Sequence, residues 1–248
     1  MAGFSTLVLA AGKGTRMKSD LPKVLHLACG QSLLLHVLKA AAAAGAARHH
    51  VVVGHGRDLV LEELINSGLP FAEVWQKEQK GTGHAAQEAL PALKGAKEDV
   101  VVILNGDGPL LQAESIAAFV AGHRAAKADL TLGVFELENP FGYGRVKLAK
   151  GALKGIVEEK EASAAERKIR LVNGGLYAVN RKLLLELLPK LKASAKTGEI
   201  YLTDVVASAS AKRKKLRVHQ FPAEELAGVN DLAQLAEVES VLRQRLCL

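Results

Sequence analysis

Three short runs of continuously apolar, largely β-branched residues constrain this fold more than any other feature of the sequence. The runs cover residues 6–9, 51–53 and 100–104. Strands that are apolar on both faces are typical of a parallel sheet with helices packed against each side. Helical patterns separate the runs, over residues 32–44, 59–65 and 83–90. This alternation predicts an α/β fold with right-handed crossovers and a mostly parallel sheet covered on both faces.

The pattern changes beyond residue 130. Strand-like runs with few helices between them cover residues 130–137, 145–148 and 169–179. The remaining expected elements are helices over 181–191 and 202–208, a strand over 216–221, and a terminal helix capped by Asn230 and Asp231. We therefore expect a Rossmann-like mixed sheet in one domain over residues 1–230. A mixed β extension is expected at about 130–180, and a C-terminal helix over 231–248.

Composition narrows the classes of partner. Lys and Arg number 33 against 26 Asp and Glu, so the formal charge is +7. This excess suits an anionic partner, but it does not separate a nucleic acid from a small phosphorylated substrate. Aromatic residues make up only 4% of the chain, which argues against single-stranded nucleic-acid binding, and the basic run over 212–215 is interpreted as a solvated turn. No nucleic-acid partner is expected.

No segment indicates a leader, a membrane span or an oxidising compartment. The apolar run over residues 4–11 lacks a preceding basic residue and is interpreted as a buried strand. Polar residues interrupt the alanine-rich stretch over 32–47, which favours a helix over a membrane span. Cys29 and Cys247 form neither a metal-spaced pair nor a disulfide framework. We therefore expect a soluble cytoplasmic protein that does not bind membranes.

The loop over residues 9–17, Leu-Ala-Ala-Gly-Lys-Gly-Thr-Arg-Met, follows the first strand. Its small residues would let backbone N–H groups approach a ligand closely, and Lys13 and Arg16 supply positive charge for phosphates. It is not a Walker A loop, because Gly14 follows the Gly-Lys pair, and Met17 stands where a dinucleotide fingerprint needs glycine. A simple tight turn remains the alternative.

Two further charged residues lie in loops. Pro22 fixes the backbone before Lys23, whose ammonium is suited to a phosphate; the alternative is a solvated surface lysine. Asp107 lies between two glycines after the most apolar strand. A carboxylate there is suited to Mg²⁺ with substrate phosphates completing the shell, whereas the alternative is an Asx-type turn that opens a helix.

Together, these motifs resemble the signature of the sugar nucleotidylyltransferases. The similarity is to the uridylyltransferase domain of the bacterial bifunctional N-acetylglucosamine-1-phosphate uridylyltransferase/glucosamine-1-phosphate acetyltransferase family. Beyond residues 9–17 and 21–26, the matching motifs are QxxQxGTGHA from Gln76, GDxPL from Gly106, GYGR from Gly142, GIVE from Gly155, NxG from Asn173, ExYxTD from Glu199 and GVN from Gly228. The resemblance covers nearly the whole chain.

The resemblance implies a role for each matching residue. Arg16 and Lys23 would be catalytic and face the triphosphate. The nucleotide would be bound by Leu9, Ala10, Ala11, Gly12, Gln76, Gly81, Thr82, Asn105, Gly106 and Asp107. The sugar would be bound, in the 130–180 extension and beside it, by Gly144, Glu158, Asn173 and Thr203. Asp107 and Asn230 would be the protein ligands of Mg²⁺, an all-oxygen pair that suits a hard cation.

The implied reaction joins UTP and N-acetylglucosamine-1-phosphate into UDP-N-acetylglucosamine and pyrophosphate, a step that supplies cell-wall precursors. A phosphate monoester is already ionised at neutral pH, so no general base or covalent nucleophile is required. His26, His55 and His84 are accordingly interpreted as structural or loop residues. The alternative within the same class is a nucleotidylyltransferase for a different sugar-1-phosphate.

The sequence also departs from the family pattern. Asn105 stands where the family often has Tyr, Gly108 where a larger residue is usual, and Gly174 where Thr is frequent, so fine sugar and base preference stays open. No hexapeptide repeat of a left-handed β-helix is found. We therefore expect no acetyltransferase activity from these residues and no β-helix-driven trimer, while the oligomeric state stays open.

Overall fold

The structure, a computed structural model, describes residues 3–246; Cys247 lies outside this range. Its main sheet has nine strands, seven of them in the order β11-β7-β10-β6-β1-β4-β5. The strands of this path are β1 (Phe4–Leu9), β4 (Ala46–Val53), β5 (Phe71–Trp75), β6 (Val100–Asn105), β7 (Leu130–Glu136), β10 (Leu171–Asn180) and β11 (Leu216–Gln220). The hairpin of β8 (Arg145–Ala149) and β9 (Ala152–Val157) joins the sheet through β10.

The sheet is mixed but mostly parallel, as the sequence predicts. β6, β1, β4 and β5 run parallel to one another, and β11 runs parallel to β7. β10 is antiparallel to both β6 and β7 and lies between them. The crossover rule accounts for the parallel half, because each parallel connection there contains a helix.

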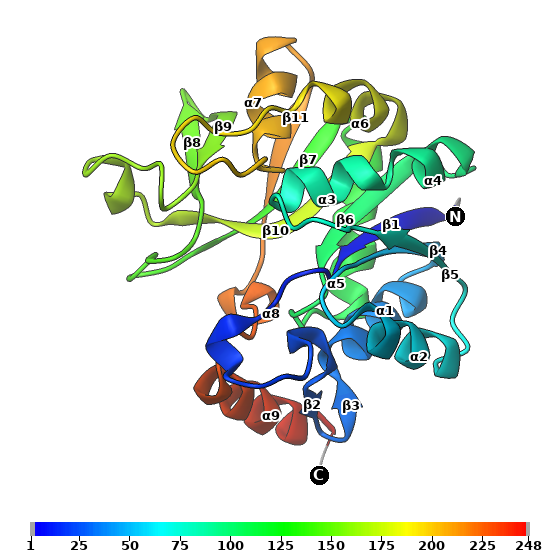
Figure 1. Cartoon of the computed structure of the whole chain (residues 1–248). Coiled ribbons are helices and arrows are strands. Elements are labelled where there is room, and N and C mark those ends of the chain that lie inside the picture. The colour runs from blue at the N-terminus through cyan, green and yellow to red at the C-terminus, as the bar shows by residue number, and fades with distance from the viewer. Residues whose placement is uncertain (1–2, 247–248) are drawn as a thin grey trace.

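Helices cover both faces of the sheet (Figure 1). On one face lie α1 (Leu33–Ala43), α2 (Arg57–Asn66) and α5 (Ala113–Ala125), and on the other α3 (Thr82–Glu88), α4 (Leu90–Gly95), α6 (Arg181–Leu187) and α7 (Asp204–Ala211). Within β1, Val8 packs into the first core and its neighbour Leu7 into the second. Successive strand side chains point to opposite faces, so an apolar run fills both cores.

Several sequence-based boundaries are wrong. The helix expected over 83–90 is two helices, because Pro91 lies in the first turn of α4, where its missing N–H costs nothing. The helix expected over 181–191 ends at Leu187 and continues as a 3-10 turn containing Pro189. The helix expected over 202–208 begins at Asp204. The strands β5 and β9 and the helices α5 and α8 (Ala223–Leu226) were not expected.

A third, smaller core joins the last helix to the glycine-rich loop. Helix α9 (Leu232–Leu246) packs against the hairpin of β2 (Leu27–Ala28) and β3 (Gln31–Ser32), with Met17 buried between them. Asp231 caps α9, since its Oδ1 accepts a hydrogen bond from Gln234 N at 2.9 Å. The backbone N–H of Asn230 in turn donates to Gln234 Oε1, so the side-chain carboxamide of Asn230 takes no part in capping the helix. Among the described residues, no helix meets the length and apolarity needed to cross a membrane.

His49 on β4 should make the fold sensitive to acid. It is fully buried, its Nδ1 contacts Thr6 Oγ1 at 2.8 Å, and burial lowers its pKa to about 4. The unfolded chain binds a proton near pH 6.5, so stability should fall as pH drops from 6.5 towards 4, by about 3 kcal/mol. Urea unfolding of wild type and His49→Gln at pH 7.5 and 4.5 measures this. Equal losses of stability in both proteins would contradict it.

Candidate functional site

Two adjoining pockets lie beyond the carboxyl ends of β1, β5 and β6, where an α/β sheet places ligand sites. We call the first, of about 550 Å³, the loop pocket; its lining includes Leu9, Ala10, Ala11, Gly12, Lys23, Gln76, Gln79, Gly81, Thr82, Ala85 and Tyr201. The second, of about 390 Å³, is the extension pocket; its lining includes Arg16, Phe141, Tyr143, Gly144, Asn173, Tyr177, Thr203, Gly228 and Asn230. Five residues line both: Leu9, Thr82, Asn105, Asp107 and Glu158.

The structure therefore brings the sequence-predicted site residues together, with one exception. Gly106 lines neither pocket. Its N–H donates to Leu9 O at 3.0 Å, and a Cβ at this position would lie 3.2 Å from the same oxygen. Gly106 thus acts as a spacer that allows the ends of β6 and β1 to lie close together. Gln79, Tyr143 and Tyr177 line the pockets without having been predicted; Gln79 and Tyr143 lie inside the QxxQxGTGHA and GYGR motifs, which were the available signal.

Two glycines are required by close approaches in the loops. Gly14 has a φ of 61°, and a Cβ there would lie 2.5 Å from Lys23 Cβ, so this glycine lets the two loop segments pack. Gly81 has a φ of 107°, and a Cβ there would lie 2.4 Å from Ile200 O. An L side chain at Gly81 would meet both backbone strain and a backbone clash.

Four side chains from distant parts of the chain meet where the pockets adjoin. Lys23 Nζ forms an ion pair with Asp107 Oδ2 and donates to Asn230 Oδ1 at 3.3 Å. Arg16 Nη2 donates to the same Asn230 oxygen at 2.8 Å. One carboxylate thus faces two cations, so the cluster carries a net positive charge that suits an anionic ligand.

The Asp107 and Asn230 oxygens fit a hard cation, because both accept hydrogen bonds from one ammonium and so converge on one point. Val229 N donates to Asp107 O at 2.9 Å, which holds the two loops together. Within residues 3–246, no group of three or more His, Cys, Asp or Glu side chains is arranged to hold a metal ion. Two protein oxygens would leave the other coordination positions for phosphate and water.

Polar side chains of the extension pocket are held by hydrogen bonds. Thr203 Oγ1 donates to Glu158 Oε1 at 2.8 Å, and burial raises the pKa of the Glu158 carboxyl. Asn173 Oδ1 accepts from Gly175 N at 3.0 Å, and Asn173 N donates to Gly144 O at 2.8 Å. These bonds restrict the side chains before any ligand binds.

An ion pair between buried Arg145 and partly exposed Glu159 supports the loop at the rim of the extension pocket. Arg145 is 2% exposed, and its Nη2 donates to Glu159 Oε2 at 2.6 Å. The same carboxylate oxygen accepts from Gly142 N at 3.2 Å, and Arg145 Nη1 donates to Tyr143 O. Glu159 is functional in this sense and was not predicted from sequence, because its partners lie in another segment of the chain. The pair holds Gly142 and Tyr143 at the pocket.

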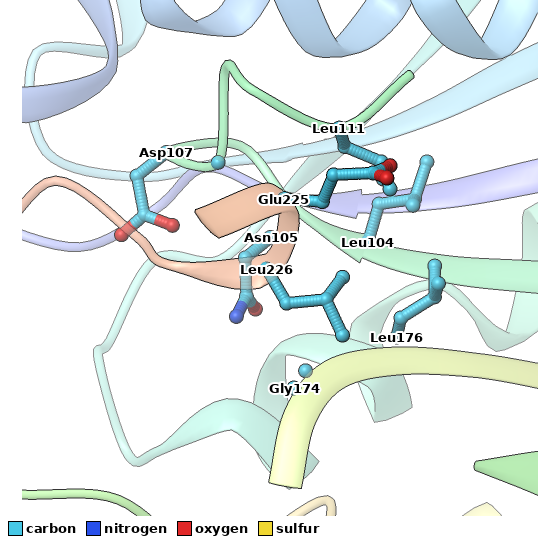
Figure 2. A pocket seen from close by; sticks show the side chains of 10 residues that line it. Leu104, Asn105, Asp107, Leu111, Gly174, Leu176, Glu225 and Leu226 are labelled. Atoms are coloured by element: carbon cyan, nitrogen blue, oxygen red, sulfur yellow. The ribbon is translucent and has the colours of Figure 1, made fainter. Parts of the chain in front are cut away.

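Three departures from the family pattern, Asn105, Gly108 and Gly174, line one small recess beside Asp107 (Figure 2). Its volume is about 20 Å³, enough for one water molecule but not for a sugar substituent. A Cβ at Gly174 would lie 2.3 Å from Leu226 Cδ1. Leu226 of α8 therefore occupies the space that a larger residue 174 would need, so Gly174 does not loosen the extension pocket.

Comparisons with known proteins identify what this chain is similar to. Residues 6–202 match the family described as MobA-like NTP transferase domain. The bifunctional protein GlmU of Synechococcus sp. (strain CC9605) is 44% identical over 98% of this chain and 53% of its own length. GlmU of Corynebacterium efficiens is 42% identical over 97% and 51%. The chain thus spans about half the length of these curated relatives.

Solved structures share the fold. A UDP-glucose pyrophosphorylase complexed with UDP-glucose superimposes with a TM-score of 0.75 at 22% identity, over 98% of this chain and 99% of that chain. A putative glucose-1-phosphate thymidylyltransferase from Bacillus anthracis superimposes with a TM-score of 0.77 at 19% identity, over 97% and 96%. Both likenesses confirm the mixed, mostly parallel α/β architecture.

Proposed function

This chain belongs to the family of MobA-like NTP transferase domains and is therefore a nucleotidyltransferase; from this premise we propose that it transfers UMP from UTP to N-acetylglucosamine-1-phosphate. The products would be UDP-N-acetylglucosamine and pyrophosphate. The observation that carries the proposal is the cluster where the two pockets adjoin, formed by Arg16, Lys23, Asp107 and Asn230. The identity of 44% to a GlmU protein supports it.

The division into two pockets suits a reaction between two phosphorylated molecules. UTP would lie in the loop pocket and the sugar phosphate in the extension pocket, so that the phosphates meet at Lys23 and Arg16. An oxygen of the sugar phosphate forms a bond to the α-phosphorus of UTP, while the bond to the leaving pyrophosphate breaks. The attacking phosphate is already ionised, so positioning and charge neutralisation supply the catalysis.

Asp107 and Asn230 are the residues that would hold Mg²⁺, the ion favoured by an all-oxygen site next to phosphates. A bound Mg²⁺ neutralises phosphate charge and orients the phosphate oxygens. Lys23 donates to both of these side chains and Arg16 to Asn230, and the two cations would turn to the phosphates when the nucleotide binds. The positive charges of Lys23 and Arg16 thus offset the negative charge of Asp107.

The extension pocket supports an acceptor with several hydrogen-bonding groups. Glu158 offers a half-buried carboxylate, Asn173 a carboxamide fixed by Gly175, and Gly144 a backbone next to both. A Cβ at Gly144 would lie 3.4 Å from Glu158 Oε2, so the glycine leaves this edge accessible. A different sugar-1-phosphate is the second candidate acceptor, because Asn105 and Gly108, which depart from the family pattern, lie beside Asp107.

We expect N-acetylglucosamine-1-phosphate to be used with a kcat/KM on the order of 10²-fold above that of glucose-1-phosphate. A substrate that lacks the acetamido group leaves the polar atoms of the pocket that would bind this group without hydrogen-bond partners. Pyrophosphate release from UTP with a panel of sugar phosphates measures this ratio. Asn173→Ala should narrow the gap, chiefly by harming the preferred acceptor. Equal use of glucose-1-phosphate by the wild type would instead favour the second candidate acceptor.

A further inference from the structure

The carboxamide of Gln76 has one possible orientation. Gln76 follows β5, is 3% exposed and lines the loop pocket. Its amide nitrogen Nε2 lies 3.1 Å from Gly81 O. A backbone carbonyl only accepts hydrogen bonds, so the atom facing it must be the NH₂ group and not the amide oxygen. The chemistry of the partner therefore fixes which way the amide points.

The same NH₂ group determines the tautomer of His84. Gln76 Nε2 lies 3.1 Å from His84 Nδ1, and an amide NH₂ only donates, so Nδ1 accepts and carries no proton. The ring proton of neutral His84 then lies on Nε2, which faces Glu88 Oε1 at 3.1 Å. His84 and Glu88 are one turn apart on α3. A chain of donors and acceptors thus runs from Glu88 through His84 to Gln76.

The consequence lies in the pocket. With both amide hydrogens engaged, Gln76 Oε1 is the remaining polar atom, and within residues 3–246 no donor is bonded to it. The pocket therefore offers a lone acceptor. Uracil carries a hydrogen on N3 and can donate to it, whereas cytosine has a lone pair on N3 and would be repelled. Nucleobases are commonly read along this edge.

We propose that His84 is a positioning residue for base selection: by accepting from Gln76 it holds the Gln76 oxygen towards the base, and so favours bases with a ring N–H over cytosine. This rests on the proposed function in placing the nucleobase in the loop pocket. His84 itself lines neither pocket. Its effect passes through the amide: without an acceptor at Nδ1, the bond to Gly81 O is the one remaining contact among the described residues that opposes a turn presenting the NH₂ group to cytosine N3.

Binding of UTP and CTP to wild type, His84→Leu and His84→Asn tests the proposal. Isothermal titration calorimetry measures nucleotide binding without turnover. Leucine removes the acceptor, whereas the oxygen of asparagine replaces Nδ1. We expect His84→Leu to lower the ratio of UTP to CTP affinity by at least about tenfold and His84→Asn to retain most of it. His55→Leu, outside both pockets, is the control and should leave the ratio unchanged.

An equal loss of affinity for both nucleotides in His84→Leu would show a packing role and overturn the proposal, as would an unchanged ratio. Should His84→Leu fail to fold, N3-methyl-UTP with the wild type replaces it: binding at least about tenfold weaker than UTP supports the oriented acceptor, and equal binding overturns it. Failure of the proposed function appears separately, as no pyrophosphate release from UTP with any sugar phosphate.

Discussion

Asp107→Asn should lower kcat by at least about 10²–10³-fold while leaving the fold intact. The amide keeps the shape of the side chain but loses the charge that balances Lys23 and attracts a divalent cation. Steady-state pyrophosphate release, measured over a range of Mg²⁺ concentrations, tests this, with circular dichroism to check the fold. Asp58→Asn is a matched control, because that side chain is 92% exposed on α2.

Near-wild-type turnover of a folded Asp107→Asn variant at limiting Mg²⁺ would remove Asp107 from the metal site. The structure also gives the variant a specific signature. Asp107 holds the Asn230 loop through its backbone oxygen, which accepts from Val229 N, and this bond survives the substitution. The loss should therefore appear in kcat and in the Mg²⁺ requirement, with little change in the unfolding temperature.

Lys23→Met should also lower kcat, by on the order of 10²–10³-fold. Its ammonium contacts Asp107 and Asn230 and lies between the loops that the reacting phosphates would approach. Methionine keeps the apolar stem that packs against Gly14 and removes only the charge. Lys39→Met, on α1 with Gln31 as its partner, is the control and should leave turnover unchanged.

The double variant of Lys23 and Asp107 adds a sharper test. The two side chains are paired and serve one cluster, so their losses should be less than additive. Fully additive losses in kcat/KM would mean that the two residues act independently, and would contradict the single cluster on which the proposed function rests.

Sequence alone determined the architecture of the parallel half and the location of the loops. Residues 51–53 and 100–104 are apolar at every position, and such short β-branched runs are typical of strands covered on both faces. The glycine-rich segments after β1 and β6 could likewise be predicted as ligand-binding loops, because a turn that approaches a ligand closely needs small residues. These signals are local, so they can be recognised in a short segment without knowledge of the rest of the chain.

Edge strands and very short helices could not be predicted from the sequence. β5 carries Glu73 and two partly exposed residues, because it lies at the edge of the sheet, and its pattern does not differ from that of a loop. α8 is a single turn, too short for any helical period to register. Even so, its Leu226 fills the space above Gly174, and the arm that follows it carries Asn230 to the site.

Only the tertiary structure decided which side chains act together. Arg16 contacts Asn230, which lies 214 positions later in the chain, and Arg145 of β8 contacts Glu159, which follows β9. His84 had been interpreted as a structural or loop residue; its link to Gln76 depends on a helix that begins where the chain has turned back from β5. Hydrophobic periodicity specifies elements one at a time, whereas contacts between elements follow from how the sheet and its crossovers pack. The residue types of this site were therefore determined by sequence, and their partnerships by the fold.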